Sequence, residues 1–508
     1  MAAFSFRDLS TAAVLGLSAS ALVIATFIHR FIVYWRLRHF RGPFWGAFSK
    51  IFLIRAAIKG TSHTSLNWAA DTYGNLARVG PRNLITNDPD IWRHVNGVRQ
   101  DYVKSEMYAA LSFDARGRNI LSETYEPRHK VLRQKMMNGF SGKEINSLEQ
   151  SLDEVINELI ALLRRKYLST NKTFRMLDLA PIIQYFASDF ISKIDFGESF
   201  GYLAADEDLY DYQKQTKKSL PLICLCENWP GFFWFMDSRW LRPLWAPAIG
   251  DKVGLGRVMG YTQKIVSERF REEKDVHRDM LASFIRHGLS HEEAECAAVL
   301  QVIAGSDTVA AALRATLFYI ITTPMAYKRL QEELDEAKAK RSATSSSTII
   351  TDAECRHLGY LQGCIKEGIR LWPPLAGLKE KVVPPAGEYM EGKFIPGGTC
   401  IGIDMWGMLR KKDVFGEDAD LFRPERWTET TDPEQLHRME RIQEFAFGHG
   451  KWQCLGKTIA LIEMTKCIAE LMQRFDFAIT DPKHPITYRH SGVMVQSNFY
   501  VRVSERGQ

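Results

Sequence analysis

Apolar positions at helical spacing dominate the pattern of this chain. The strongest run follows Ser290-His291-Glu292-Glu293, where a serine and a glutamate three residues later form a capping-box signature. From there to Thr322 apolar residues occupy nearly every face, which predicts a buried helix of about 32 residues and about 48 Å. Thr323-Pro324 would end this helix.

A second apolar run lies near the N-terminus. Leu9 to Ile28 contains no charged residue and, as a helix, would span about 30 Å, the thickness of a bilayer core. Basic residues follow the run, while Arg7 and Asp8 before it cancel, so we expect the C-terminal bulk to stay cytoplasmic. The alternative is a cleaved signal peptide, because Ala19-Ser20-Ala21 looks like a cleavage site.

Strand signals are few. Lys393 to Ile403, with Pro396-Gly397-Gly398 as a turn, predicts a hairpin, and Val493 to Val495 with Phe499 to Val503 predicts another. The fold class is therefore mainly α with a small β region.

The chain shows no clear domain boundary after its N-terminal segment. The Ser/Thr-rich run Lys338 to Thr348 is interpreted as a surface loop, so we expect an anchor and basic linker over 1–41 and one domain over 42–508.

Composition narrows the choice of function. The net charge of +6 includes no basic stripe interleaved with aromatics, so nucleic-acid binding is not indicated. The eight cysteines show no zinc or disulfide spacing, which fits a reducing compartment. A cluster of Arg128, Lys130, Arg133 and Lys135 is either a solvated helix face or a docking patch for an acidic electron-donor protein.

The segment Phe447 to Gly456 carries the clearest chemistry. It places Cys454 in a glycine-rich loop directly before an apolar, helix-like run. Gly448, Gly450 and Gly456 let the backbone curl towards the sulfur, and loop N–H groups and the positive helix end lower a thiol pKa. The arrangement suits a cysteine thiolate that ligates iron.

Two further pairs have more than one interpretation. Asp307 lies in the apolar helix, where an acid is costly unless it is partnered or used. The adjacent Thr308 can bond back to the carbonyl of Ala304, so the pair either assists proton delivery or simply packs. Glu367 and Arg370 share one helix face and form either a surface ion pair or a buried network.

Together these motifs resemble the cytochrome P-450 family from about Arg41 to the C-terminus. The family's haem-binding signature F-x-x-G-x-R-x-C-x-G is matched except at Trp452, which stands where arginine is usual. The other matches are Glu367 and Arg370 as E-x-x-R, Arg426 in Pro424-Glu425-Arg426, the oxygen-activation motif Ala304 to Thr308, and His129 with Arg133.

The resemblance implies a triangular, helix-rich haem domain that binds haem b with Cys454 as the axial iron ligand. Asp307 and Thr308 would be catalytic, and Glu367, Arg370 and Arg426 structural. The implied haem contacts are Phe447, Gly448, Gly450, Lys451, Gly456, Arg133, His129 and Lys381, with Lys381 or Lys451 in place of the usual propionate arginines. The implied substrate pocket comprises Tyr108, Leu111, Phe113, Val302, Ala304, Leu375, Ala376, Leu378, Val493 and Met494.

The expected activity is oxidation of a lipophilic small molecule with dioxygen. Electrons would come from an NADPH-dependent cytochrome reductase that carries the flavins, with cytochrome b5 as a second candidate donor. The anchor would sit in endoplasmic-reticulum lipid with the domain facing the cytoplasm. The cysteine loop and the Phe422 to Trp427 segment look like fungal members, loosely the pisatin-demethylase-like group, which indicates secondary-metabolite biosynthesis.

Two alternatives remain. One is a haem-thiolate isomerase, dehydratase or peroxygenase without a reductase, against which the pair Asp307-Thr308 counts. The other is a non-enzymatic membrane haem-binding protein, which Trp452 and Lys381 slightly favour because they weaken the expected propionate contacts.

Overall fold

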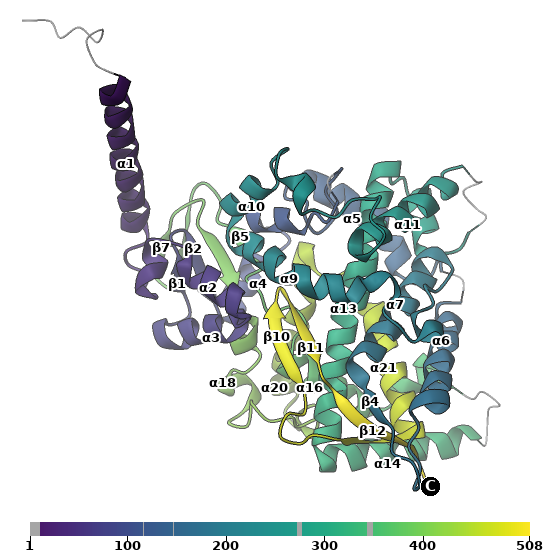
Figure 1. Cartoon of the computed structure of the whole chain (residues 1–508). Helices are drawn as coiled ribbons and strands as arrows, with labels where there is room; N and C mark the ends of the chain where they lie inside the picture. Colours follow the sequence, from purple (N-terminus) through teal and green to yellow (C-terminus); the bar gives the residue numbers. More distant parts are fainter. Residues whose placement is uncertain (1–10, 115, 146, 272–276, 343–348, 508) are drawn as a thin grey trace, which may run out of the picture.

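The computed structural model describes residues 11–114, 116–145, 147–271, 277–342 and 349–507. They form a helix-rich body with small sheets, from which α1 projects as a separate rod (Figure 1). The longer helices are α1 (Thr11–Arg36), α2 (Ile51–Lys59), α3 (Ser62–Tyr73), α5 (Glu126–Phe140), α6 (Leu148–Leu162), α7 (Leu179–Phe196), α9 (Tyr212–Asn228), α11 (Gly254–Arg269), α13 (His291–Thr322), α14 (Pro324–Ser342), α16 (Gly359–Leu371), α20 (Pro433–Gln443) and α21 (Lys457–Arg474).

Helix α13 runs through the middle of the body, with the bounds that the sequence predicts. Ser290 Oγ accepts from the N–H of Glu293, and the Glu293 carboxylate accepts from the N–H of Ser290, so the predicted capping box is formed. The helix is long and apolar enough to cross a membrane, yet most of it is buried against α7, α11, α16 and α21. It is therefore the central core helix.

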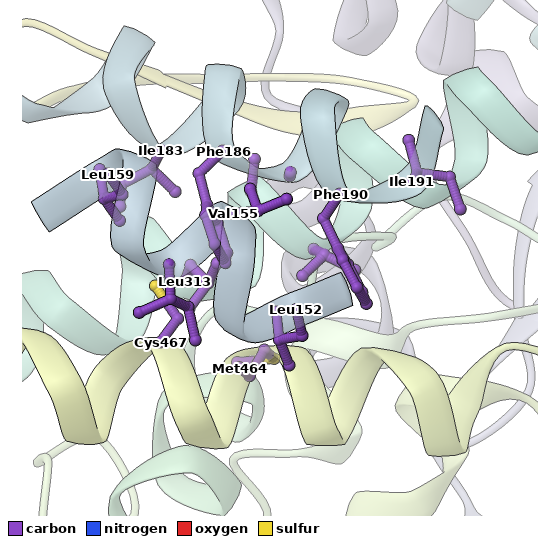
Figure 2. Close-up of a cluster of buried hydrophobic side chains, with 14 of the residues drawn as sticks. Leu152, Val155, Leu159, Ile183, Phe186, Phe190, Ile191, Leu313, Met464 and Cys467 are labelled. Atoms are coloured by element: carbon purple, nitrogen blue, oxygen red, sulfur yellow. The ribbon is translucent and has the colours of Figure 1, made fainter. Parts of the chain in front are cut away.

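The largest hydrophobic core lies where α6, α7, α13 and α21 meet. Figure 2 shows Leu152, Val155 and Leu159 of α6 facing side chains of α7, with Leu313, Met464 and Cys467 closing the cluster. Burial of these side chains fixes α13 relative to α21, the helix that follows Cys454.

The strands form four small sheets within the described residues. The strands are β1 (Ala77–Gly80), β2 (Asn83–Thr86), β3 (Val103–Lys104), β4 (Met176–Asp178), β5 (Lys381–Val382), β6 (Glu388–Met390), β7 (Lys393–Ile395), β8 (Cys400–Ile403), β9 (Phe475–Ile479), β10 (Thr487–Ser491), β11 (Val493–Ser497) and β12 (Tyr500–Glu505). The largest sheet has the order β1-β2-β8-β5-β3, in which only β2 and β8 are parallel.

Both predicted hairpins are wrong in their pairing, although the strands exist. β7 pairs with β6, and β8 pairs with β2 and β5. In the same way β11 pairs with β10, while β12 pairs with β4 and β9. A turn signal predicts that the chain reverses, but the unpaired strand edge bonds to whichever strand the tertiary fold brings alongside.

Helix α1 ends later than predicted, at Arg36 instead of Ile28, and the predicted start at Leu9 lies outside the described residues. Its side chains from Val14 to Ile32 are exposed, and Val14–Arg36 is long and apolar enough to span a membrane. The predicted loop at Lys338 is also wrong in its first part, because α14 continues to Ser342; residues 343–348 lie outside the described part.

Candidate functional site

A cavity of about 1120 Å³ opens between α5, α9, α13 and the loop of Cys454. Its wall includes Ala304, Gly305, Asp307 and Thr308 from α13. Residues that are distant in sequence therefore meet around one space large enough for a cofactor and a ligand.

The loop conformation depends on glycine. Gly448 has φ +79°, and a Cβ there would lie 2.9 Å from the carbonyl oxygen of Trp452. Gly450 has φ +60°, and a Cβ would lie 2.0 Å from the carbonyl oxygen of Asn96. The loop then closes through the N–H of Cys454, which donates to the carbonyl of Phe447 at 2.7 Å. Only glycine satisfies both the left-handed backbone and the close approach.

The Cys454 sulfur opens onto the cavity. Burial raises the pKa of its thiol, while the N–H groups of Gly456 and Lys457 and the cations of Arg133 and Lys379 oppose that rise. The loop groups thus act in the direction that the sequence predicts, but burial outweighs them. A metal cation on the sulfur would supply the missing stabilisation of the thiolate.

The cavity wall near the loop is strongly basic. Lys104 and Lys379 both line it, and burial lowers their pKa values to about 7 and about 8. Lys381 is a correction to the expected haem contacts: its ammonium is buried beneath the wall and donates to the Tyr108 hydroxyl at 2.9 Å and the Lys379 carbonyl at 2.7 Å. Lys379, two residues earlier, faces the cavity instead, with a left-handed backbone (φ +47°).

The other predicted haem contacts also divide into residues that line the cavity and residues that do not. His129 and Arg133 line the cavity, as do Phe447, Gly448 and Gly456. Lys451 does not, because its ammonium donates to the carbonyls of Gln100 and Tyr102, and Gly450 is turned towards Asn96.

The residues present fit a haem. Trp452 lines the cavity, and its indole N–H is buried without a hydrogen-bond partner in the described part of the chain. Together with Lys104, Lys379 and Arg133 it forms a set of donors beside the cysteine loop, which suits two anionic propionate groups. The donors that line the cavity beside this loop are therefore an indole and basic side chains from other segments, which no local motif could reveal.

Asp307 is both partnered and open to the cavity. Its Oδ1 accepts from Gln184 Nε2 at 2.7 Å, and Gln184 Oε1 in turn accepts from Arg314 at 3.1 Å. Burial raises the pKa of Asp307 to about 6, against the opposing charge of Arg314 and the hydrogen bond from Gln184. Thr308 Oγ1 donates to the carbonyl of Ala304 at 2.8 Å, as predicted. The sequence missed Gln184 and Arg314, because nothing local connects α7 with this acid.

Glu367, Arg370 and Arg426 form a buried network away from the cavity wall, not a surface pair. The first two are fully buried and joined at 2.7 Å, and Arg426 reaches the same carboxylate at 3.3 Å. Trp427 Nε1 donates to Glu367 at 2.8 Å, and Arg370 donates to the carbonyl of Leu409 at 2.8 Å. The network holds α16 against the chain that leads to the cysteine loop.

The predicted substrate residues are only partly in the wall. Tyr108, Leu111, Phe113, Ala304, Leu375 and Val493 line the cavity. Val302, Ala376, Leu378 and Met494 are buried in the core instead. In β11 the alternation of strand side chains sends Val493 to the cavity and Met494 to the core, and on α13 Val302 faces the core. Sequence analysis also missed one face of α9, including Leu222, Ile223, Cys226 and Glu227.

Residues 41–503 match the family described as Cytochrome P-450. The chain is 38% identical to cytochrome P-450 monooxygenase ABA1 of Pyricularia oryzae over 482 residues, 94% of each chain. It is 33% identical to aba1 of Botryotinia fuckeliana over 92% of each chain, and 33% identical to abl1 of Leptosphaeria maculans over 89% of this chain and 80% of that one.

Proposed function

The chain belongs to the cytochrome P-450 family, and from that premise we propose that it is a membrane-anchored haem-thiolate monooxygenase that oxidises a lipophilic small molecule. The observation that carries the proposal is Cys454 on a cavity wall that also presents basic side chains and the unpartnered indole N–H of Trp452. The relatives named above are fungal monooxygenases, which supports a role in secondary-metabolite biosynthesis.

Haem bound here would supply the iron at which dioxygen is activated. Cys454 would hold its iron through the sulfur, and the propionates would be held by Arg133, Lys104, Lys379 and Trp452. Phe447 lies in the same wall and, with haem bound, would limit the access of water to the sulfur.

Asp307 and Thr308 would move protons on the distal side. Because the pKa of Asp307 is about 6, the carboxyl exchanges a proton readily near neutral pH. Gln184 occupies Oδ1, which leaves Oδ2 for exchange, and the Thr308 hydroxyl faces the same cavity. Gln184 and Arg314 are positioning residues in this scheme.

Electrons would come from a separate NADPH-dependent reductase, with cytochrome b5 as a second candidate donor. Of the basic cluster on α5, Lys130 is exposed and suits docking of an acidic donor. Arg128 is also exposed, but it lines the cavity and pairs with Glu123 at 3.5 Å. Arg133 lines the cavity, and Lys135 pairs with Glu293 at 2.8 Å. Helix α1 would anchor the enzyme in the endoplasmic reticulum with the domain facing the cytoplasm.

The test begins with the spectrum of the reduced, carbon-monoxide-bound protein, wild type beside Cys454→Ala. We expect a strongly red-shifted Soret band that the variant loses; a band typical of histidine ligation in the wild type would refute the proposal.

Turnover assays with reductase, NADPH and dioxygen then distinguish the monooxygenase from the two alternatives. A peroxygenase would work with hydrogen peroxide alone, and a haem carrier would consume no NADPH with any substrate. Thr308→Ala should consume NADPH while forming less product.

A further inference from the structure

Glu227 is a buried carboxylate with no part in the scheme above. It lies near the C-terminal end of α9, lines the cavity, and is 9% exposed. Within the described ranges no hydrogen bond or ion pair reaches its carboxylate. Burial alone raises its pKa to about 7. A buried carboxyl group without a partner is costly, so its presence requires a reason.

Other acids of the same wall are satisfied by the protein. Asp237 pairs with Arg242 at 2.9 Å, and Asp251 accepts from a backbone N–H at 2.9 Å. Glu463 also has an unpartnered oxygen, but it lies on α21, which directly follows the cysteine loop, and so belongs to the haem site. Glu227 therefore differs from Asp237 and Asp251 in having no protein partner, and from Glu463 in lying on α9 and not next to the cysteine loop.

The surroundings place Glu227 away from the Cys454 loop. It also lines a smaller adjoining pocket, formed by α2, α3, α9 and β10 among others, to which the residues of that loop do not contribute. The β10–β11 turn approaches it closely: a Cβ on Gly492 (φ +83°) would lie 3.4 Å from Oε2. Tyr108 lies on the same stretch of wall, and the charge of Glu227 adds to burial in raising the pKa of its hydroxyl.

The chemistry of the cavity selects the ligand group. The wall is largely apolar, so an ammonium ligand would lose its hydration on entering the cavity and is disfavoured. A ligand carboxylate would be repelled by ionised Glu227. A neutral hydroxyl satisfies both forms of the acid, because it donates to the carboxylate and accepts from the carboxyl.

We propose that Glu227 binds a hydroxyl group of a neutral lipophilic substrate and thereby selects alcohols over the corresponding ethers. This inference rests on the proposed function, since it assigns one end of the substrate in the same cavity.

The test measures equilibrium binding of two probes, farnesol and its methyl ether, from the Soret change of the full-length haem enzyme. Wild type should bind the alcohol roughly tenfold or more tightly, the fold-change of a buried hydrogen bond to an ionised acceptor. Glu227→Leu should bring the ratio of the two affinities close to one. Asp237→Asn, which alters a partnered acid of the same wall, should keep the wild-type ratio.

The pH dependence gives a second readout. The preference for the alcohol should rise as pH increases through about 7, because ionised Glu227 accepts more strongly and no longer donates to the ether. Lys104 and Lys379 also titrate near this range, whereas His490 of the smaller pocket and Tyr108 do not. Glu227→Gln leaves those lysines intact and should abolish the rise.

An equal affinity of wild type for both probes, or an unchanged ratio in a Glu227→Leu enzyme with a normal carbon-monoxide band, overturns the inference. If Glu227→Leu does not fold, a pH-dependent preference that persists in Glu227→Gln overturns it equally. Absence of the red-shifted band from the wild type would instead refute the proposed function. A failure of the Glu227 inference can therefore be told from a failure of the proposed function.

Discussion

At the scale of single residues, burial decides the chemistry more than the neighbouring motif does. Burial, not the glycine loop, sets the direction of the Cys454 pKa, and it raises the pKa of Asp307 as well. Both groups line the same cavity, and perturbed groups are common at functional sites. Their function and their cost to folding therefore have the same origin.

Asp307 offers a test of that cost. Its folded-state pKa of about 6 exceeds the ordinary value of 3.8 for an aspartate, so the folded protein binds more protons than the unfolded chain between those values. Stability should fall as pH rises from about 4 to about 6. Asp307→Asn, which mimics the neutral acid, should raise the free energy of unfolding at pH 7 by up to about 3 kcal/mol while slowing turnover. Urea unfolding of both proteins at pH 4.5 and 7.5 checks this, and a difference independent of pH would contradict it.

At the scale of elements, two contacts fix the helices around the cavity. Gly305 of α13 lies against α7, and a Cβ there would come 2.5 Å from Cγ1 of Ile191. The second contact is the buried network between α16 and the segment of Arg426.

Gly305→Ala should destabilise the fold by about 1–3 kcal/mol through overpacking, in spite of the higher helix propensity of alanine. Ile191→Ala should cost stability by itself but remove most of the penalty of Gly305→Ala in the double variant. Denaturant unfolding of the four proteins gives the coupling energy. If the two substitutions had additive effects on stability, the clash of the added methyl group with Ile191 would not be the source of the penalty.

Glu367→Gln should destabilise the protein by about 3–5 kcal/mol, because two buried guanidinium groups lose their shared carboxylate. The yield of protein with the red-shifted band and the denaturation midpoint both report this. Lys366→Gln, on the same helix as Glu367, is the matched control. It breaks the half-buried pair of Lys366 with Glu440 of α20 and should cost less than about 1 kcal/mol. Similar losses in both variants would rule out a special role for the network.

At the scale of the whole molecule, the two long apolar helices α1 and α13 lie in opposite environments. α13 is enclosed by the body, whereas α1 leaves its apolar side chains exposed. The same composition therefore supports a core in one place and, in our proposal, a membrane anchor in the other.

Removal of residues 1–28 should shift the enzyme from the membrane fraction to the supernatant and leave the carbon-monoxide spectrum unchanged. The buried contacts of Val33, Leu37 and Phe40 with the body remain in this variant. Fractionation after carbonate washing is the measurement. Retention in the membrane would instead indicate a second contact, for which the exposed Trp234 and Phe235 are candidates.

The sequence by itself determined what local periodicity and spacing encode: the bounds and cap of α13, the cysteine loop, the back-bond of Thr308 and the predominance of helix. Only the tertiary structure decided which strands pair, that Lys379 and not Lys381 faces the cavity, that Glu227 lines it, and that Gln184 bonds to Asp307. The physical reason is that a local pattern specifies a helix or a turn, whereas pairing, burial and hence pKa depend on chain segments hundreds of residues apart.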